Sequence, residues 1–333
     1  MNFGRLHCAE NSRKAGYGAV SSTGFRLLQK LFTGNITMLR NSVSSRNLIL
    51  ISLGLLIPAA MTIVLASKAV LATTLQGDEN DQRKDVFYTT SSSSAAGGGS
   101  EELFAIEVTG SKVTTTDIGP INGGACASLA LSPSGTLFGM CGNLFGAQQL
   151  ATFNPRTGLA TLFGIPVSGL AVMAMAFGPN GILYAVGDCN PDPNFVDCTP
   201  GSDPNYNSLY TVNEATGAFT RVGSTSAPQF FMDLAFDRDG NMFGVTTTLN
   251  PSLVPAILYR IDPATGAATK IVNLAGSNTV MGLAFGRDGK LYATDFTDNP
   301  GLYLIDIKTG FETAIAALPF GLSSGLELAD PLP

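Results

Sequence analysis

A short phrase that begins with Leu and ends with Thr-Gly occurs five times along the chain. The copies are LFAIEVTG (103–110), LATFNPRTG (150–158), LYTVNEATG (209–217), LYRIDPATG (258–266) and LYLIDIKTG (302–310). Their final glycines lie 48, 59, 49 and 44 residues apart. A recurrence of about 40 to 50 residues is typical of a propeller or solenoid array. The repeat therefore predicts one large domain.

A second phrase precedes each of the last four copies of the first. Its copies are LALSPSGTLFG (129–139), MAFGPNGILYA (175–185), LAFDRDGNMFG (234–244) and LAFGRDGKLYA (283–293). Each consists of two apolar runs separated by Pro, Asp, Asn and Gly, which predicts a β-hairpin. The Thr-Gly phrase and the run after it predict a second hairpin. Two hairpins give four strands per repeat, which is the content of one propeller blade.

The two ends of the repeat region complement each other. The first repeat lacks the LAF strand and begins at 85–88, which aligns with 290–293, whereas 325–329 matches the LAF strand at 282–285. We therefore expect an all-β, five-bladed β-propeller over 85–333, closed by the C-terminal strand joining the first blade. That arrangement would leave no open sheet edge at the ends of the ring.

The LYxIDxxTG phrase resembles the repeats of exported bacterial β-propellers, a family without an assigned function, over about residues 85–329. This resemblance implies the fold and assigns no catalytic residue. More distantly, the chain looks like lactonase and lyase propellers. Those rings generally have more blades, and the lyases rely on histidine.

The N-terminal segment has the composition of an export signal. Arg40 and Arg46 precede an apolar run at 48–65, and small residues at 70–72 fit a signal-peptidase site. We expect 38–72 to be a signal peptide, 1–37 an upstream extension before a start at Met38, and 73–84 a linker. The alternative is an uncleaved membrane anchor, because 18 apolar residues can just span a bilayer. We predict a periplasmic, extracellular or cell-surface protein that contacts a membrane only if the segment is uncleaved.

Removal of residues 1–72 makes the chain strongly acidic. The remainder contains 24 acidic and 11 basic residues, a net charge of −13, and has lost the single histidine, His7. Such a surface repels phosphate backbones, which argues against nucleic-acid partners. Without an imidazole, Ser-His-Asp and Cys-His catalysis and the common zinc sites are excluded.

Four cysteines form two close pairs, as expected in an oxidising compartment. If a hairpin places Leu131 opposite Thr136, then Cys126 lies opposite Cys141, within reach of a disulfide. Cys189 and Cys198 would enclose a loop rich in Pro and Asp. The alternative is two sets of free thiols.

The connections at one end of the blades are short and uniform, while those at the other end vary, notably 91–102, 187–208 and 246–256. Ligands often bind variable loops on a rigid scaffold. We therefore expect a binding or interaction module with a protein or glycan ligand on the variable-loop face, near Phe230 and Phe231. The alternative is a carboxylate-based hydrolase, glycosidase or esterase-like, which requires two acids converging at the channel mouth.

No cofactor is expected, apart from a possible calcium ion. Asp188, Asp233 and Asp295 lie next to predicted strands and are candidate Ca²⁺ ligands, since Ca²⁺ takes clustered carboxylate oxygens. In the alternative interpretation Asp233 caps a strand or turn, and the two phenylalanines pack between blades.

Overall fold

The computed structural model describes residues 84–92, 101–142, 147–189, 206–247, 255–276, 279–295, 300–320 and 323–330. All of them belong to the second of two compact units, which begins at Asp78. The predicted upstream extension, the signal peptide or anchor, and the linker up to residue 83 lie outside these residues. Among the described residues, no helix is long and apolar enough to cross a membrane.

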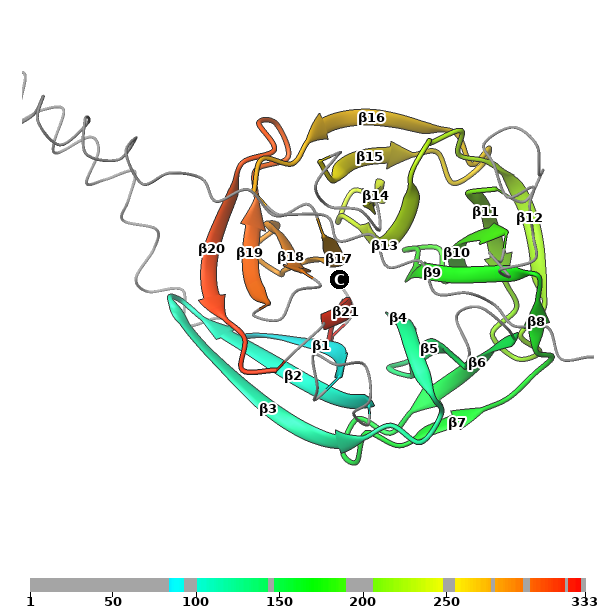
Figure 1. The fold of residues 1–333 in the computed structure, drawn as a ribbon, viewed down its shortest axis with the longest axis horizontal. Coiled ribbons are helices and arrows are strands. Elements are labelled where there is room, and N and C mark those ends of the chain that lie inside the picture. The colour runs from blue at the N-terminus through cyan, green and yellow to red at the C-terminus, as the bar shows by residue number, and fades with distance from the viewer. Residues whose placement is uncertain are drawn as a thin grey trace, which may run out of the picture. The chain divides into compact units, whose positions relative to one another are not determined.

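Five antiparallel sheets surround a central axis in the described part of the chain (Figure 1). We number these blades along the chain and give their strands from the axis outward. Blade 1 contains β21 (Ser323–Leu328), β1 (Lys84–Ser92), β2 (Glu101–Thr109) and β3 (Lys112–Pro120). Blade 2 contains β4 (Ala125–Leu131), β5 (Leu137–Gly142), β6 (Ala147–Phe153) and β7 (Ala160–Leu162), with β8 (Val167–Ser168) paired to β6.

The other three blades follow the same order without a crossover. Blade 3 contains β9 (Leu170–Phe177), β10 (Leu183–Cys189), β11 (Ser208–Val212) and β12 (Phe219–Ser224). Blade 4 contains β13 (Phe230–Phe236), β14 (Met242–Thr247), β15 (Ile257–Ile261) and β16 (Ala268–Asn273). Blade 5 contains β17 (Val280–Phe285), β18 (Leu291–Asp295), β19 (Gly301–Ile305) and β20 (Glu312–Ala317). The five-bladed all-β propeller predicted from the repeats is confirmed.

The ring is closed by β21, as predicted. This last strand pairs antiparallel with β1, placing Leu328 opposite Phe87. The hydroxyl of Thr89 donates to the Gly325 carbonyl at 2.7 Å, and the hydroxyl of Thr90 lies 2.9 Å from the Cys126 carbonyl of blade 2. The two ends of the described propeller are thereby joined to each other and to the next blade.

The predicted alignment of the first blade is wrong by one residue. Phe87 pairs with Ile106 and Leu328, the same relation that Leu291 has with Ile305 and Phe285 in blade 5. Phe87 is therefore equivalent to Leu291, one position before the residue to which the sequence alignment assigned it. The reason is burial: Phe87 is fully buried, so the register places this large apolar side chain inside the propeller.

The predicted disulfide is present, although one step of its derivation is wrong. Leu131 pairs with Leu137 rather than with Thr136, which shifts the register at the turn by one residue. A β-bulge between Cys126 and Ser128 shifts it back, so that Cys126 lies opposite Cys141 and the two form a disulfide. The second predicted pair is untested, since Cys198 lies outside the described residues.

The Thr-Gly phrase forms the turn between the two outer strands of a blade. In blade 4, Asp262 Oδ1 accepts the Ala264 N–H at 2.9 Å, and the Gly266 N–H donates to the Asp262 carbonyl at 2.8 Å. Gly310 in the equivalent turn of blade 5 has a φ of +71°, and an added Cβ would collide with the Asn273 carbonyl oxygen of blade 4. Glycine is required there because the turn is left-handed and touches the neighbouring blade. The recurrence of the phrase is thus a structural requirement.

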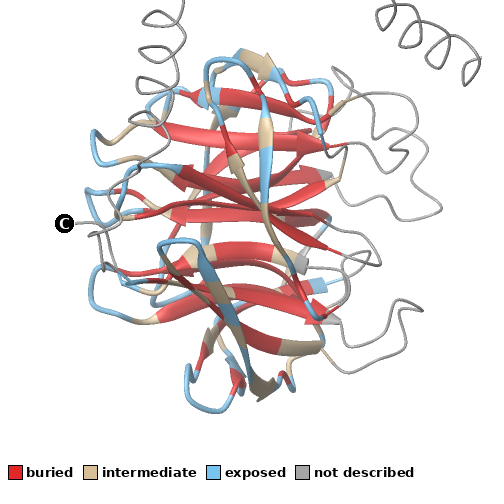
Figure 2. Cartoon of the chain, turned by 90° about the vertical axis from the view of Figure 1, so that its left-hand side faces the viewer, coloured by how far each residue is buried: buried red, intermediate tan, exposed pale blue. Residues whose placement is uncertain are grey.

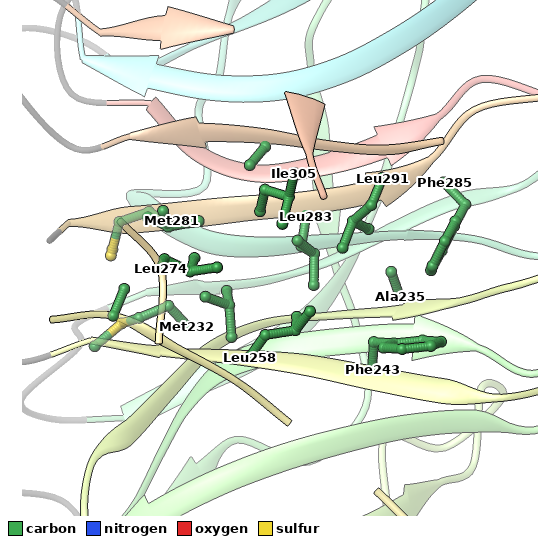
Figure 3. Packing of buried hydrophobic residues seen from close by; sticks show 14 residues of the cluster. Met232, Ala235, Phe243, Leu258, Leu274, Met281, Leu283, Phe285, Leu291 and Ile305 are labelled. Atoms are coloured by element: carbon green, nitrogen blue, oxygen red, sulfur yellow. The ribbon is translucent and has the colours of Figure 1, made fainter. Parts of the chain in front are cut away.

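The hydrophobic core is divided among the gaps between neighbouring blades. The cluster between blades 4 and 5, for example, includes Leu258 and Phe243 facing Leu283, Phe285 and nearby residues (Figure 3). Both faces of β17 are buried along its whole length, and the other described inner strands are mostly buried, which explains the non-alternating apolar runs in the sequence. Exposed turns lie together along one side of the molecule (Figure 2). This side carries the short, uniform connections, and we call it the short-turn end.

Candidate functional site

A cavity of about 200 Å³ opens at the short-turn end of the propeller axis. The last residues of all five innermost strands contribute to its lining, which places it on the axis. These residues are Leu131, Phe177, Phe236, Phe285 and Leu328. The rest of the lining comes from the adjoining strand positions and turns: Pro133, Ala176, Gly178, Pro179, Ala235, Asp237, Arg238, Leu283, Ala284, Glu327 and Asp330.

Glu327 differs from the residues at the equivalent position of the other four blades. The position before the last residue of each innermost strand is Ala130, Ala176, Ala235 and Ala284 in four blades, and Glu327 in the fifth. Small residues suit the position because the strands converge at the axis. Glu327 is thus an ionisable residue at a position that carries alanine in the other blades, and three of those alanines, Ala176, Ala235 and Ala284, also line the cavity.

Burial raises the pKa of Glu327 to about 8, and the Leu131 N–H, which donates to its carboxyl, opposes that rise. The carboxyl is therefore mostly protonated at neutral pH and acts as both hydrogen-bond donor and acceptor. The group facing it across the strand pair is Tyr88, on β1. Burial, followed by the charge of Asp330, raises the pKa of that phenol.

The charged residues at the mouth of the cavity form local contacts. Asp237 closes its turn by accepting the N–H groups of Asp239 and Asn241 at 3.0 and 2.8 Å. The Arg238 guanidinium donates to the Arg287 carbonyl, and Asp330 forms an ion pair with the Arg287 side chain. The cavity thus combines an apolar wall, one glutamate inside and a charged rim.

Asp233 lies deeper on the axis and connects three blades. Its Oδ2 accepts the N–H of Leu283 on β17 at 2.7 Å and the N–H of Leu326 on β21 at 3.0 Å. Its Oδ1 accepts the N–H of Leu234 at 2.9 Å. Burial raises the pKa of Asp233 well above its usual value, the three N–H donors oppose the rise, and the charge of Glu327 adds to it. With both oxygens engaged and no exposed surface, Asp233 holds the inner strands together.

The other two predicted calcium ligands lie on different blades. Asp188 on β10 is buried, and its Oδ1 accepts the Asn207 N–H at 3.3 Å. Asp295 on β18 accepts the Gly301 N–H at 2.7 Å and the Tyr303 hydroxyl at 3.4 Å. Both therefore stabilise the connection from the second to the third strand of their blade. Among the described residues, no three or more carboxylate, thiolate or imidazole groups gather as a metal site would require.

The two predicted ligand-contacting phenylalanines differ in environment. Phe231 is 2% exposed and packs against Tyr259 between blades 3 and 4, with ring centroids 5.5 Å apart. Phe230 is half-buried beside Tyr206, at a centroid distance of 6.0 Å. Much of the predicted variable-loop face, including 93–100, 190–205 and 248–254, lies outside the described residues.

Glu327 was missed in the sequence analysis, although its signal was present. The alignment of 325–329 with 282–285 sets Glu327 against Ala284, and it was used only to close the ring. A comparison of the inner strands position by position exposes the two acidic departures from small residues, Asp233 and Glu327. The structure adds that the first is bonded to backbone and the second lines a cavity.

No protein-family model and no curated protein matches the chain. Solved structures similar to it include TolB from Acinetobacter baumannii, with 12% identity over 78% of this chain and 70% of that one and a TM-score of 0.45. A gluconolactonase from Xanthomonas campestris has 14% identity, coverage of 71% and 87%, and a TM-score of 0.42. The PQQ-bound aldose sugar dehydrogenase from Streptomyces coelicolor has 12% identity, coverage of 74% and 90%, and a TM-score of 0.41. Similarities this low carry no functional argument, so function must be argued from the residues.

Proposed function

We propose that this propeller is an exported binding module that admits a small ligand, or one group of a larger ligand, to the axial cavity. The observation behind the proposal is Glu327, an ionisable side chain in a largely apolar cavity at a position occupied by alanine in the other blades. Binding sites are typically concave and apolar, with a few polar groups that orient the ligand. The cavity has that composition.

Export is supported by the disulfide between Cys126 and Cys141. Such bonds persist in oxidising compartments and are rare in the cytosol. The acidic composition of the chain after residue 72 agrees with a solvent-exposed protein without nucleic-acid partners. A protein or glycan ligand on the variable-loop face remains a prediction from the sequence, separate from the axial site proposed here.

Catalysis by a pair of carboxylates is the weaker alternative. A pKa of about 8 would suit Glu327 as a general acid. Hydrolysis of a glycoside also requires a second carboxylate that can reach the substrate. Asp233 is fully buried and has both oxygens bonded to backbone N–H groups. At the rim, Asp237 closes its own turn and Asp330 is ion-paired with Arg287, so all three acids are engaged in structural contacts.

The proposal can be tested by a screen of metabolites and glycans in which binding is detected by thermal shift. The binding site of each ligand is then located by NMR of alanine methyl groups. Ligands of the axial site are expected to shift the methyls of Ala176, Ala235 and Ala284, which line the cavity. Ala215 and Ala264 lie in the exposed outer turns of the same end and serve as controls. A set of ligands that moves no cavity methyl, while moving signals elsewhere, would contradict the proposed site.

A further inference from the structure

We propose that the group entering the axial cavity is a small, uncharged carboxamide, held by hydrogen bonds to the carboxyl group of Glu327. The inference rests on the proposed binding function and adds the chemical class of the ligand. It follows from three properties of the cavity. The charged groups of its rim are engaged in other contacts, its wall is apolar, and the partner described for Glu327 is a hydrogen-bond donor.

The charged side chains at the rim bind one another and the backbone, which disfavours a charged ligand. Asp330 forms an ion pair with the Arg287 side chain, and Asp237 accepts two backbone N–H groups of its own turn. Among the described residues of the lining, the one basic side chain is Arg238, and its guanidinium donates to the Arg287 carbonyl. A charged ligand would have to break one of these contacts or enter without a counter-ion. Burying a charge without a partner is costly.

The wall of the cavity is apolar, and its aromatic rings are already packed. Each of the three phenylalanines in the lining contacts another ring in the gap between two blades. The pairs are Phe177 with Phe138, Phe236 with Tyr184, and Phe285 with Phe243, with ring centroids 5.6, 5.7 and 5.2 Å apart. Together with the leucines and alanines of the lining, these rings offer apolar contacts to an alkyl group.

Glu327 is the polar group of this wall and acts as an acid. It is partly exposed, so a ligand can reach it. Its surroundings are apolar and the Arg238 guanidinium is engaged elsewhere, so the neutral form is favoured and the pKa is raised to about 8. The partner described for the carboxyl is the Leu131 N–H, which is itself a donor. That group cannot accept the proton of the acid, so a ligand that brings an acceptor would complete the hydrogen bonding.

A carboxamide matches both hydrogen-bonding capacities of a protonated carboxyl group. Its carbonyl oxygen accepts the O–H of the acid, and its N–H donates to the other carboxyl oxygen. It carries no charge and therefore needs no counter-ion in the cavity. An ammonium or amidinium offers donors alone, and a carboxylate offers acceptors but buries a charge. The amide is thus the group that uses Glu327 in its neutral form.

Binding of the amide requires the Glu327 proton, so the affinity should depend on pH. With a pKa of about 8, the carboxyl is protonated at lower pH and loses its proton at higher pH. The affinity should therefore be level below pH 8 and fall about tenfold per pH unit above it. The other titratable or charged groups around Glu327 are the Tyr88 phenol on β1, the buried Asp233 on β13, and Asp237, Arg238 and Asp330 at the rim.

The experiment compares three probes that share a planar head and an isopropyl tail: neutral isobutyramide, anionic isobutyrate and cationic isobutyramidinium. Binding to the purified protein is followed by alanine-methyl NMR, because probes of this size bind weakly. At about pH 6.5 we expect isobutyramide to bind at least tenfold more tightly than either charged probe. It should shift the methyls of Ala176, Ala235 and Ala284, which line the cavity.

The matched variants separate the proton of Glu327 from its position. Glu327→Ala restores the residue of the other blades, should therefore fold, and should bind isobutyramide at least tenfold more weakly than the wild type. Glu327→Gln supplies a donor and an acceptor at every pH. It should bind the probe at least tenfold more tightly than Glu327→Ala and show no fall in affinity above pH 8. Glu214→Gln, in an exposed outer turn, is the control and should leave binding unchanged.

Tighter binding of isobutyrate or isobutyramidinium at the cavity methyls would overturn the amide inference while leaving the axial binding site in place. Unchanged binding in Glu327→Ala would overturn it as well. So would a pH dependence that persists in Glu327→Gln, because it would then come from another group such as Asp233 or Tyr88. If none of the three probes shifts the cavity methyls, the amide inference fails. The wider screen, which does not depend on the class of the ligand, then decides the binding function.

Discussion

Asp233 joins three inner strands through one carboxylate, so its removal should weaken the whole ring. Asp233→Ala takes the acceptor away from the N–H groups of Leu283 and Leu326 on other blades, and from that of Leu234 on its own strand. All three bonds are buried. A buried N–H without an acceptor costs about 1–3 kcal/mol, so the two inter-blade donors alone predict a loss of roughly 2–6 kcal/mol. That is a large part of the roughly 5–15 kcal/mol that stabilises a typical domain.

The assay is urea unfolding, followed by circular dichroism, of the wild-type protein and two variants. Asp262→Ala is the matched control, because Asp262 accepts the Ala264 N–H at 2.9 Å in an exposed turn where water can replace it. We expect the control to lose about 0.5–1 kcal/mol. The loss of unfolding free energy in Asp233→Asn should lie between those of the other two variants. Its amide keeps one acceptor oxygen, but its NH₂ group faces the remaining N–H donors. If Asp233→Ala loses no more than Asp262→Ala, the carboxylate does not couple the blades and our account of the axis is wrong.

Three further predictions concern the closure of the ring, the disulfide and Glu327. Deletion of 323–333 removes β21 and leaves the edge of β1 open, so light scattering should show an unfolded or self-associated protein in place of a monomer. Replacing Cys126 and Cys141 by serine opens a loop of 15 residues and should lower the free energy of unfolding by about 3 kcal/mol, whereas an unchanged value would show that the bond adds nothing. The folded chain keeps the Glu327 proton up to a pKa of about 8, while the unfolded chain releases it near 4.5, so the folded state binds more protons between these values. The wild-type stability should therefore fall relative to Glu327→Gln by up to about 1.4 kcal/mol per unit as the pH rises from 4.5 to 8, and parallel pH profiles of the two proteins would refute this.

The fold could be predicted from the sequence because its turns depend on local chemistry. The turn that Gly266 closes on Asp262 recurs in three other blades, where Gly158, Gly217 and Gly310 donate to Asn154, Asn213 and Asp306. The spacing of the phrases counts the blades. Register was less predictable, because bulges in the inner strands are set by packing around the axis. At the first hairpin of blade 2, the predicted register was off by one residue at the turn, and the bulge beside Cys126 restores the predicted pairing with Cys141. In the first blade, the predicted register was also off by one residue, because Phe87 is fully buried.

The site was less predictable than the fold because its parts converge only when the ring closes. Glu327 stands at the end of the chain, and Phe177 lies 150 positions earlier, yet both line one cavity. The spacing of these residues in the sequence does not indicate that they lie close together. The three aspartates predicted as candidate metal ligands all accept backbone N–H groups that hold connections and blades, and their positions beside strands did not reveal those bonds.

The repeat provides its own reference for separating structural from ligand-directed residues. Equivalent positions on the five blades have nearly the same surroundings. A residue that differs in type from its equivalents therefore introduces a free-energy cost that those equivalents avoid. For Asp233 the cost of burying a carboxyl is offset by three backbone N–H donors, two of them from other blades, and the departure is explained by stability. Glu327 has one backbone donor, the Leu131 N–H, against the three of Asp233, so hydrogen bonds to the inner strands offset less of the cost of placing it there. An alanine, as in the other four blades, would avoid that cost. This difference is why we propose Glu327, and not Asp233, as a ligand-contacting residue of the axial cavity.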